Sequence, residues 1–101
     1  MVWDLRAALL RKEEFETARL IDFDFRLRAR TFRLLADILD LPRDEWAQKT
    51  VLAADDALLD RLAHETGRPR EELSRLHRES RERARRRLIE TIGDPTPVRL
   101  G

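Results

Sequence analysis

The sequence predicts an all-α fold, a four-helix bundle formed by one domain spanning residues 1–101. The composition is 42% hydrophobic and 41% charged with only 3 glycines and 4 prolines, which is typical of amphipathic helices. Apolar residues recur with the period of an α-helix, and prolines and glycines fall between these periodic segments, where helices begin and end. A chain of this length has room for one hydrophobic core.

The first predicted helix is long. Two sets of apolar residues recur every seven positions and form adjoining stripes: Leu20, Leu27, Leu34 and Leu41, and Phe25, Phe32 and Leu39. We expect this helix to begin between Asp4 and Phe15. It should end near Asp40, because Pro42 disfavours helical geometry in the residue before it.

Two short helices are expected next. Pro42 suits the first position of a helix, and a carboxylate at Asp44 would meet the positive end of its dipole. Its predicted buried face consists of Trp46, Thr50, Val51 and Ala54. Asp55 or Asp56 would then cap a third helix, which Gly67 would end by adopting a positive φ. This third helix should bury Leu58, Leu59 and Leu62.

The fourth predicted helix is again long and runs from Pro69 to about Ile92. Its apolar and small residues form one stripe: Leu73, Leu76, Ser80, Ala84, Leu88 and Ile92. The small side chains of Ser80 and Ala84 would let another helix approach closely. Gly93 and the prolines after it end the helix, so we expect a bundle over residues 15–92 and an extended tail over residues 93–101.

Catalytic and metal-binding patterns are absent from the sequence. The three glycines are isolated, which excludes a glycine-rich phosphate loop, and there is no cysteine. Asp60 and His64 share a helix face but lack a third metal ligand. His77 lies between Arg75 and Arg78, so we expect it at the surface. The sequence therefore predicts a protein that is not an enzyme, with no metal and no cofactor.

Basic residues are concentrated in the last third of the chain. Residues 67–101 carry a net charge of +4, whereas the first 66 residues carry −3. In one interpretation, the third and fourth helices form a helix-turn-helix that binds nucleic acid through Arg68, Arg70, Arg75 and Arg78. The alternative is a solvated helix face. We favour the latter because glutamates precede arginines by four residues, as in Glu71–Arg75, Glu79–Arg83 and Glu82–Arg86.

Two sequence blocks are more specific than composition. The first block is formed by Phe25, Ala29, Arg30, Arg33, Leu34 and Leu35, spaced as F-x-x-x-A-R-x-x-R-L-L. The second block, residues 45–55, reads E-W-A-Q-K-T-V-L-A-A-D. This pair resembles the zeta subunit family of bacterial F-type ATP synthases, small helical inhibitors also described as a domain of unknown function. The resemblance extends over about residues 15–90.

The resemblance implies a four-helix bundle whose N-terminal segment enters the F1 sector and blocks ATP hydrolysis. Residues 1–15 have the amphipathic character that such a segment needs, with apolar anchors and charges around them. The candidate partner-binding residues are Trp3, Leu5, Arg6, Leu9, Leu10, Lys12 and Phe15. In the alternative, the first turns fold back and bury Trp3 and Leu9 against the bundle.

The first ten residues are more apolar than the charged opening usual in the zeta family. A diverged paralogue that kept the bundle and changed its partner would also have such an opening. Residues 1–12 do not have the pattern of a signal peptide, and no segment is apolar enough to enter a membrane. We therefore expect a cytoplasmic protein that reaches the membrane-attached F1 sector only through its partner.

Overall fold

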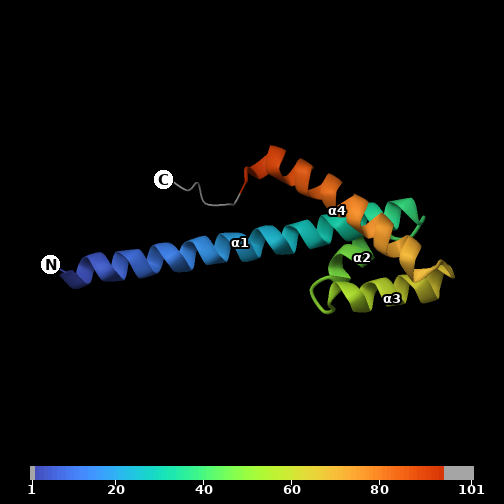
Figure 1. Cartoon of the computed structure of the whole chain (residues 1–101), viewed down its shortest axis with the longest axis horizontal. Coiled ribbons are helices and arrows are strands. Elements are labelled where there is room, and N and C mark those ends of the chain that lie inside the picture. Colours follow the sequence, from blue (N-terminus) through green and yellow to red (C-terminus); the bar gives the residue numbers. More distant parts are fainter. Residues whose placement is uncertain (1, 95–101) are drawn as a thin grey trace.

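The computed structural model describes residues 2–94, with side chains at residue 14 and from residue 16 onward. This part of the chain contains four helices and no strand, which confirms the all-α prediction (Figure 1). The helices are α1 (Val2–Ile38), α2 (Arg43–Lys49), α3 (Asp55–Thr66) and α4 (Arg70–Ile92). As predicted, α1 and α4 are long, and α2 and α3 are short.

The helices gather around the C-terminal half of α1. Helix α1 packs against both α2 and α4, and α3 packs against α4. Figure 1 shows that α1 extends well past the other three helices, and the molecule measures 63 × 25 × 22 Å. Packing therefore covers α1 unevenly along its length.

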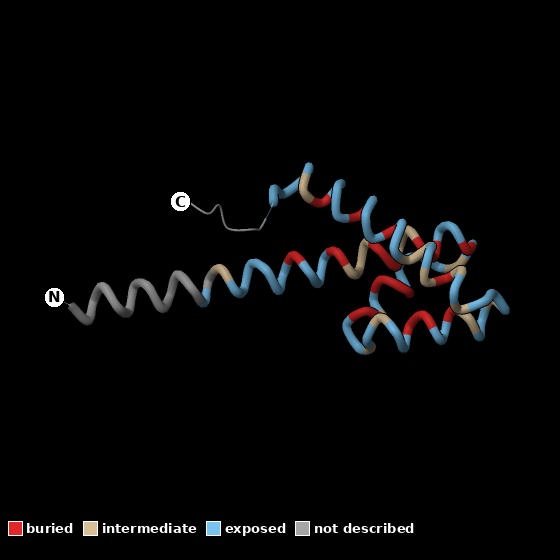
Figure 2. Tube along the Cα trace, in the orientation of Figure 1, coloured by how far each residue is buried: buried red, intermediate tan, exposed pale blue. Residues whose placement is uncertain are grey.

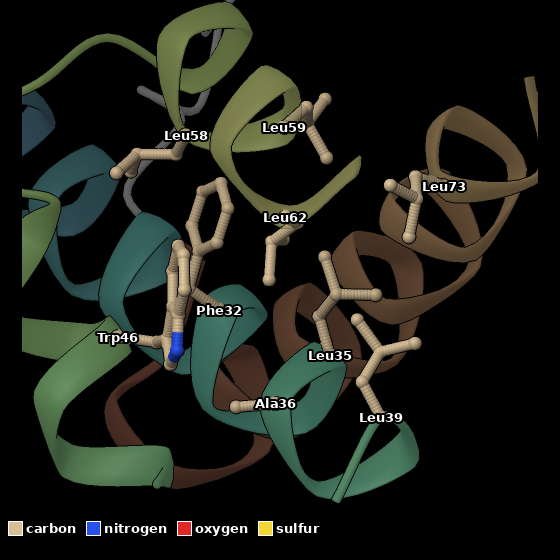
Figure 3. Close-up of a cluster of buried hydrophobic side chains, with 9 residues drawn as sticks. All are labelled: Phe32, Leu35, Ala36, Leu39, Trp46, Leu58, Leu59, Leu62 and Leu73. Carbon is tan, nitrogen blue, oxygen red and sulfur yellow. The ribbon is translucent and has the colours of Figure 1, made fainter. Parts of the chain in front are cut away.

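The main core lies where all four helices meet, and Figure 3 shows its side chains pointing toward one another. Its buried members are Phe32, Leu35, Ala36, Leu39, Trp46, Leu58, Leu59, Leu62 and Leu73. Trp46 supplies most of the contribution of α2, and the Lys49 ammonium lies 4.0 Å from the centre of its ring. Burial of each large apolar side chain contributes about 1.5–3 kcal/mol. The prediction that α3 buries its three leucines is confirmed.

A smaller core joins α1 to α4 and contains Phe23, Leu27, Ala84 and Leu88. Ser80 and Ala84 are both buried in the structure, as expected for small residues at a close helix contact. The predicted stripe on α4 is wrong at its end, because Ile92 is exposed. Figure 1 shows α4 moving away from α1 toward this end.

The end of α1 is formed by backbone geometry around Asp40. Asp40 adopts a positive φ of 57°, and the amide of Leu41 donates a hydrogen bond of 2.8 Å to the carbonyl of Ala36. This bond closes the last turn, as in helix ends that use a left-handed residue. Gly67 has the same role after α3, with φ at 68°, as predicted.

Two predictions for the connection between α2 and α3 are wrong. Trp46 and Thr50 are buried as expected, but Val51 is 62% exposed and Ala54 is also exposed, because the chain leaves the helix after Lys49 and turns outward. The cap of α3 is Ala54 and makes no side-chain hydrogen bond. Asp55 lies in the first turn instead, where it binds Arg28 of α1.

Candidate functional site

The predicted partner-binding residues lie at the N-terminal end of α1. Their backbone belongs to the helix, which runs unbroken from Val2 to Ile38. A segment that folded back would need a break in this helix, so its continuity weighs against the fold-back alternative. The side chains of these seven residues lie outside the described residues: Trp3, Leu5, Arg6, Leu9, Leu10, Lys12 and Phe15.

The described residues next to this segment leave apolar side chains exposed. Leu20 is 43% exposed, Ile21 is 65% exposed and Phe25 is 42% exposed, whereas both seven-spaced stripes had predicted burial at Leu20 and Phe25. Ile21 and Phe25 are four residues apart and share a face of α1. Figure 2 shows that this stretch of α1 is mostly exposed, with burial increasing toward the helices that pack on it.

The stripe that contains Phe25 is the one that enters the main core. Phe25 precedes the fully buried Phe32 by seven residues and therefore lies on nearly the same helix face. Trp46 of α2 and the leucines of α3 pack in the same core as Phe32, whereas Phe25 belongs to neither core. The same face is thus fully buried at Phe32 and partly exposed at Phe25, on the side of the predicted partner-binding segment.

A polar pocket of about 850 Å³ is lined by residues of α1, α3, α4 and the connection between α2 and α3. Arg28 of α1 organises it: its Nε donates a hydrogen bond of 2.7 Å to Asp55, and its Nη2 donates one of 2.7 Å to the carbonyl of Ala53. Both bonds are partly buried, which strengthens them relative to surface contacts. They fasten the α2–α3 connection to α1.

His77 also lines this pocket, and the prediction that it lies at the surface is wrong. It is half-buried, not at the surface, and its ring lies 5.3 Å from that of Phe32. Its Nε2 lies 3.9 Å from an oxygen of Asp55. Burial lowers the pKa of His77, the charge of Asp55 opposes this effect, and the charges of Arg81 and Arg70 reinforce it.

The four candidate nucleic-acid residues differ in their surroundings. Arg70 donates hydrogen bonds to Asp60 at 2.9 Å and to Asp56 at 3.2 Å, and Arg68 donates one of 2.9 Å to Glu72. Arg75 and Arg78 are exposed, and no ion pair joins them to another described residue. The carboxylates beside Arg68 and Arg70 would repel phosphate. Two of the four arginines are therefore paired with carboxylates, and two are not.

The predicted pairs within α4 do not form. Glu71–Arg75, Glu79–Arg83 and Glu82–Arg86 are not among the ion pairs within 4.0 Å that the described residues make. Arginines of α4 interact instead with other parts of the chain or project into solvent. Asp60, considered above as a metal ligand, binds Arg70. No group of three potential metal ligands occurs among the described residues.

A second pocket, which the sequence did not predict, is lined mainly by arginines, and we call it the arginine pocket. It has a volume of about 360 Å³ and lies between α1, the first residue of α2, and α4. Its lining residues are Arg30, Arg33, Leu34, Arg43, Ala84 and Arg87. Arg30, Arg33 and Leu34 are close in sequence and belong to the first block of the family resemblance, whereas Arg43 and the α4 residues come from elsewhere in the chain.

No protein-family model matches the chain, and neither the characterised proteins nor the solved structures compared with it include a similar one. In the part of the chain that the structure describes, no helix combines enough length with enough apolar residues to cross a membrane.

Proposed function

We propose that the protein is a regulatory subunit similar to the zeta inhibitor, or a diverged paralogue of it, and that its N-terminal segment binds the F1 sector of an ATP synthase. Bound there, the segment would block rotation and restrain ATP hydrolysis. The proposal includes a cytoplasmic location and a four-helix bundle over residues 15–92 that serves as the scaffold. It rests on the family resemblance and on the architecture of α1.

The observation that carries the proposal is the uncovered extension of α1. Ile21 and Phe25 present an apolar face next to residues 1–15, and the helix is continuous through both regions. An amphipathic helix binds a partner by laying such a face into a groove. A segment that is already helical loses less conformational freedom on binding, which favours affinity.

ATP hydrolysis by F1 purified from the same source tests this proposal. Adding the full chain at saturating concentration should reduce the rate, and a chain lacking residues 1–15 should not. A chain lacking residues 95–101 is the matched control and should inhibit like the full chain. Undiminished hydrolysis in the presence of saturating full chain would contradict the proposal.

A nucleic-acid-binding role for α4 is the second candidate. It is favoured by the exposed guanidinium groups of Arg75 and Arg78, which form no ion pair with a carboxylate in the part of the chain that the structure describes. Under this proposal the chain shifts duplex DNA in a mobility assay at low salt, and the shift declines steeply as salt is added, because phosphate contacts release counterions. Replacing Arg68, Arg70, Arg75 and Arg78 together should abolish the shift. No shift at low salt would contradict this role.

A further inference from the structure

The arginine pocket between α1 and α4 is lined by four positively charged and two apolar residues. Arg30 and Arg33 enter it from α1, Arg43 from the start of α2, and Arg87 from α4. Leu34 and Ala84 are its other lining residues. Its volume of about 360 Å³ falls within the range of small-ligand sites. Three separate elements thus bring like charges to one hollow.

These charges are poorly neutralised. The carboxylate of Asp44 lies 3.6 Å from Arg33 Nε, and that of Asp37 lies 3.9 Å from Arg43 Nε, both beyond hydrogen-bond length. Asp44 is also largely exposed, so water weakens its attraction. Arg30 and Arg87 have no ion-pair partner among the described residues.

An unpartnered donor lies within the cluster. The Nε of Arg33 is buried and donates no hydrogen bond to the described protein. A buried donor without an acceptor is unfavourable by about 1–3 kcal/mol, more when it is charged. The arginines of the polar pocket behave differently, since Arg28 and Arg70 both donate hydrogen bonds to carboxylates. Arg33 thus differs from these two arginines in having no acceptor for its Nε.

We propose that the arginine pocket binds a phosphate group, either as inorganic phosphate or as part of a small organic phosphate. Arginine presents a planar fork of donors that matches the spacing of phosphate oxygens, and such bonds are short and strong. A phosphate would accept hydrogen bonds from the guanidinium groups that line the pocket and would offset their like charges. Leu34 and Ala84 would contact the organic part of the ligand. The site is separate from the N-terminal segment, so it does not depend on the proposed F1 interaction.

Calorimetric titration of the full chain at constant ionic strength tests the site. Inorganic phosphate should bind once per chain and saturably, with a Kd of about 1 mM or tighter. Titration with glycerol 3-phosphate distinguishes the two sources. Tighter binding of glycerol 3-phosphate identifies an organic ligand, and equal or weaker binding identifies inorganic phosphate. No saturable binding of either probe up to about 10 mM overturns the proposal.

Matched double variants separate the pocket from general charge. Arg33→Gln with Arg87→Gln should weaken phosphate binding by about tenfold or more, because each lost guanidinium removes charge-assisted hydrogen bonds. Arg75→Gln with Arg78→Gln removes the same charge from exposed positions of α4 and should change the Kd by less than about twofold, since water and salt screen those charges. Equal losses in both variants would show a nonspecific charge effect and overturn the proposal.

Two further measurements distinguish the loss of phosphate binding from a loss of charge alone and from a loss of folding. Arg33→Lys retains the charge but not the fork, so it should weaken binding by less than Arg33→Gln does. The Arg33→Gln, Arg87→Gln variant should unfold at the same or a higher temperature than the wild type without phosphate, because it removes repulsion. This shows that lost binding is not lost folding. Binding of duplex DNA without binding of either small phosphate would overturn this site and support the nucleic-acid role.

Discussion

Arg28 and Asp55, 27 residues apart in the chain, are joined by a hydrogen bond of 2.7 Å between Nε and Oδ1. The same guanidinium binds the carbonyl of Ala53, so one side chain of α1 holds both the turn before α3 and its first residue. Helix α3 is fastened to α1 by this polar contact and by the leucines it buries. This arrangement also places His77 beside Asp55.

Removing the guanidinium should therefore loosen α3. Arg28→Met keeps an apolar stem but leaves the Asp55 carboxylate and the Ala53 carbonyl without their donor, and we expect a loss of about 1–2 kcal/mol in the free energy of unfolding. The value is reduced because Asp55 is more than a third exposed. Urea denaturation followed by circular dichroism measures the loss.

Arg26 offers the matched control for this prediction. It donates a hydrogen bond of 3.0 Å to Asp22 on the exposed surface of α1. Arg26→Met should change the free energy of unfolding by less than about 0.5 kcal/mol, since exposed ion pairs contribute little. A loss in Arg28→Met no larger than that in Arg26→Met would show that the contact does not hold α3.

The environment of His77 predicts that stability depends on pH. Its pKa is lowered in the folded protein, so the unfolded chain, whose histidine has a pKa of about 6.5, takes up the proton first as the pH falls. The stabilising contribution of neutral His77 is fully present above pH 6.5. It is lost as the pH falls through the lowered folded pKa.

Denaturation at several pH values between 7.5 and 5 tests this dependence. The free energy of unfolding should fall with pH in the wild type and fall less in His77→Gln. The charged groups around His77 in the native protein are Asp55, Asp56, Arg70 and Arg81, and all are retained in this variant. His64→Gln, at an exposed position, controls for the change in histidine content. An identical pH slope in wild type and His77→Gln would exclude this origin.

Asp40 predicts a stabilising substitution. It adopts a positive φ of 57°, a conformation that an ordinary residue holds at a cost and that glycine adopts freely. Asp40→Gly should raise the free energy of unfolding by about 0.5–1 kcal/mol, and it also removes a negative charge from the negative end of the α1 dipole. Asp37→Gly, placed inside the same helix, should lower it by a similar amount. Thermal unfolding followed by circular dichroism distinguishes the two changes.

Local features of the fold were readable from the sequence because they depend on neighbouring residues. Gly67 ends α3 through its own φ, and Leu58, Leu59 and Leu62 identify the buried face of α3 by spacing alone. The extent of burial along α1 could not be predicted from neighbouring residues. Period identifies a helix face, but the positions of the helices that pack on α1 decide that Phe32 is fully buried and that Phe25 is 42% exposed.

The candidate sites also include one residue that the sequence could have predicted and one pocket that it could not. His77 was expected at the surface because arginines surround it in sequence, yet it lies four residues after Leu73 and three before Ser80, on the buried face of α4. Its spacing from Leu73 and Ser80 along the helix, unlike the arginines next to it in the sequence, predicts that His77 is buried. The arginine pocket could not be found locally, since Arg43 and Arg87 come from elements that meet Arg30 only in three dimensions.

Phe25 and Phe32 form a natural pair of test positions for the role of α1. They lie seven residues apart on nearly the same face, one 42% exposed and the other fully buried. Phe32→Ala should lower the free energy of unfolding by about 3–5 kcal/mol, because it leaves a cavity in the main core. Phe25→Ala should change it by less than about 1 kcal/mol, since Phe25 is 42% exposed and belongs to neither core. Urea denaturation measures both values.

The same substitution distinguishes a binding face from an incidental exposed phenylalanine. If the uncovered face of α1 enters a groove on F1, Phe25→Ala should weaken inhibition of ATP hydrolysis by about tenfold, as expected for an aromatic anchor at an interface. Ile92, exposed at the far end of α4, provides the control, and Ile92→Ala should leave inhibition unchanged. Equal inhibition by the wild type and Phe25→Ala would confine binding to residues 1–15. In that case the exposed face beside them serves only to carry the segment away from the packed helices.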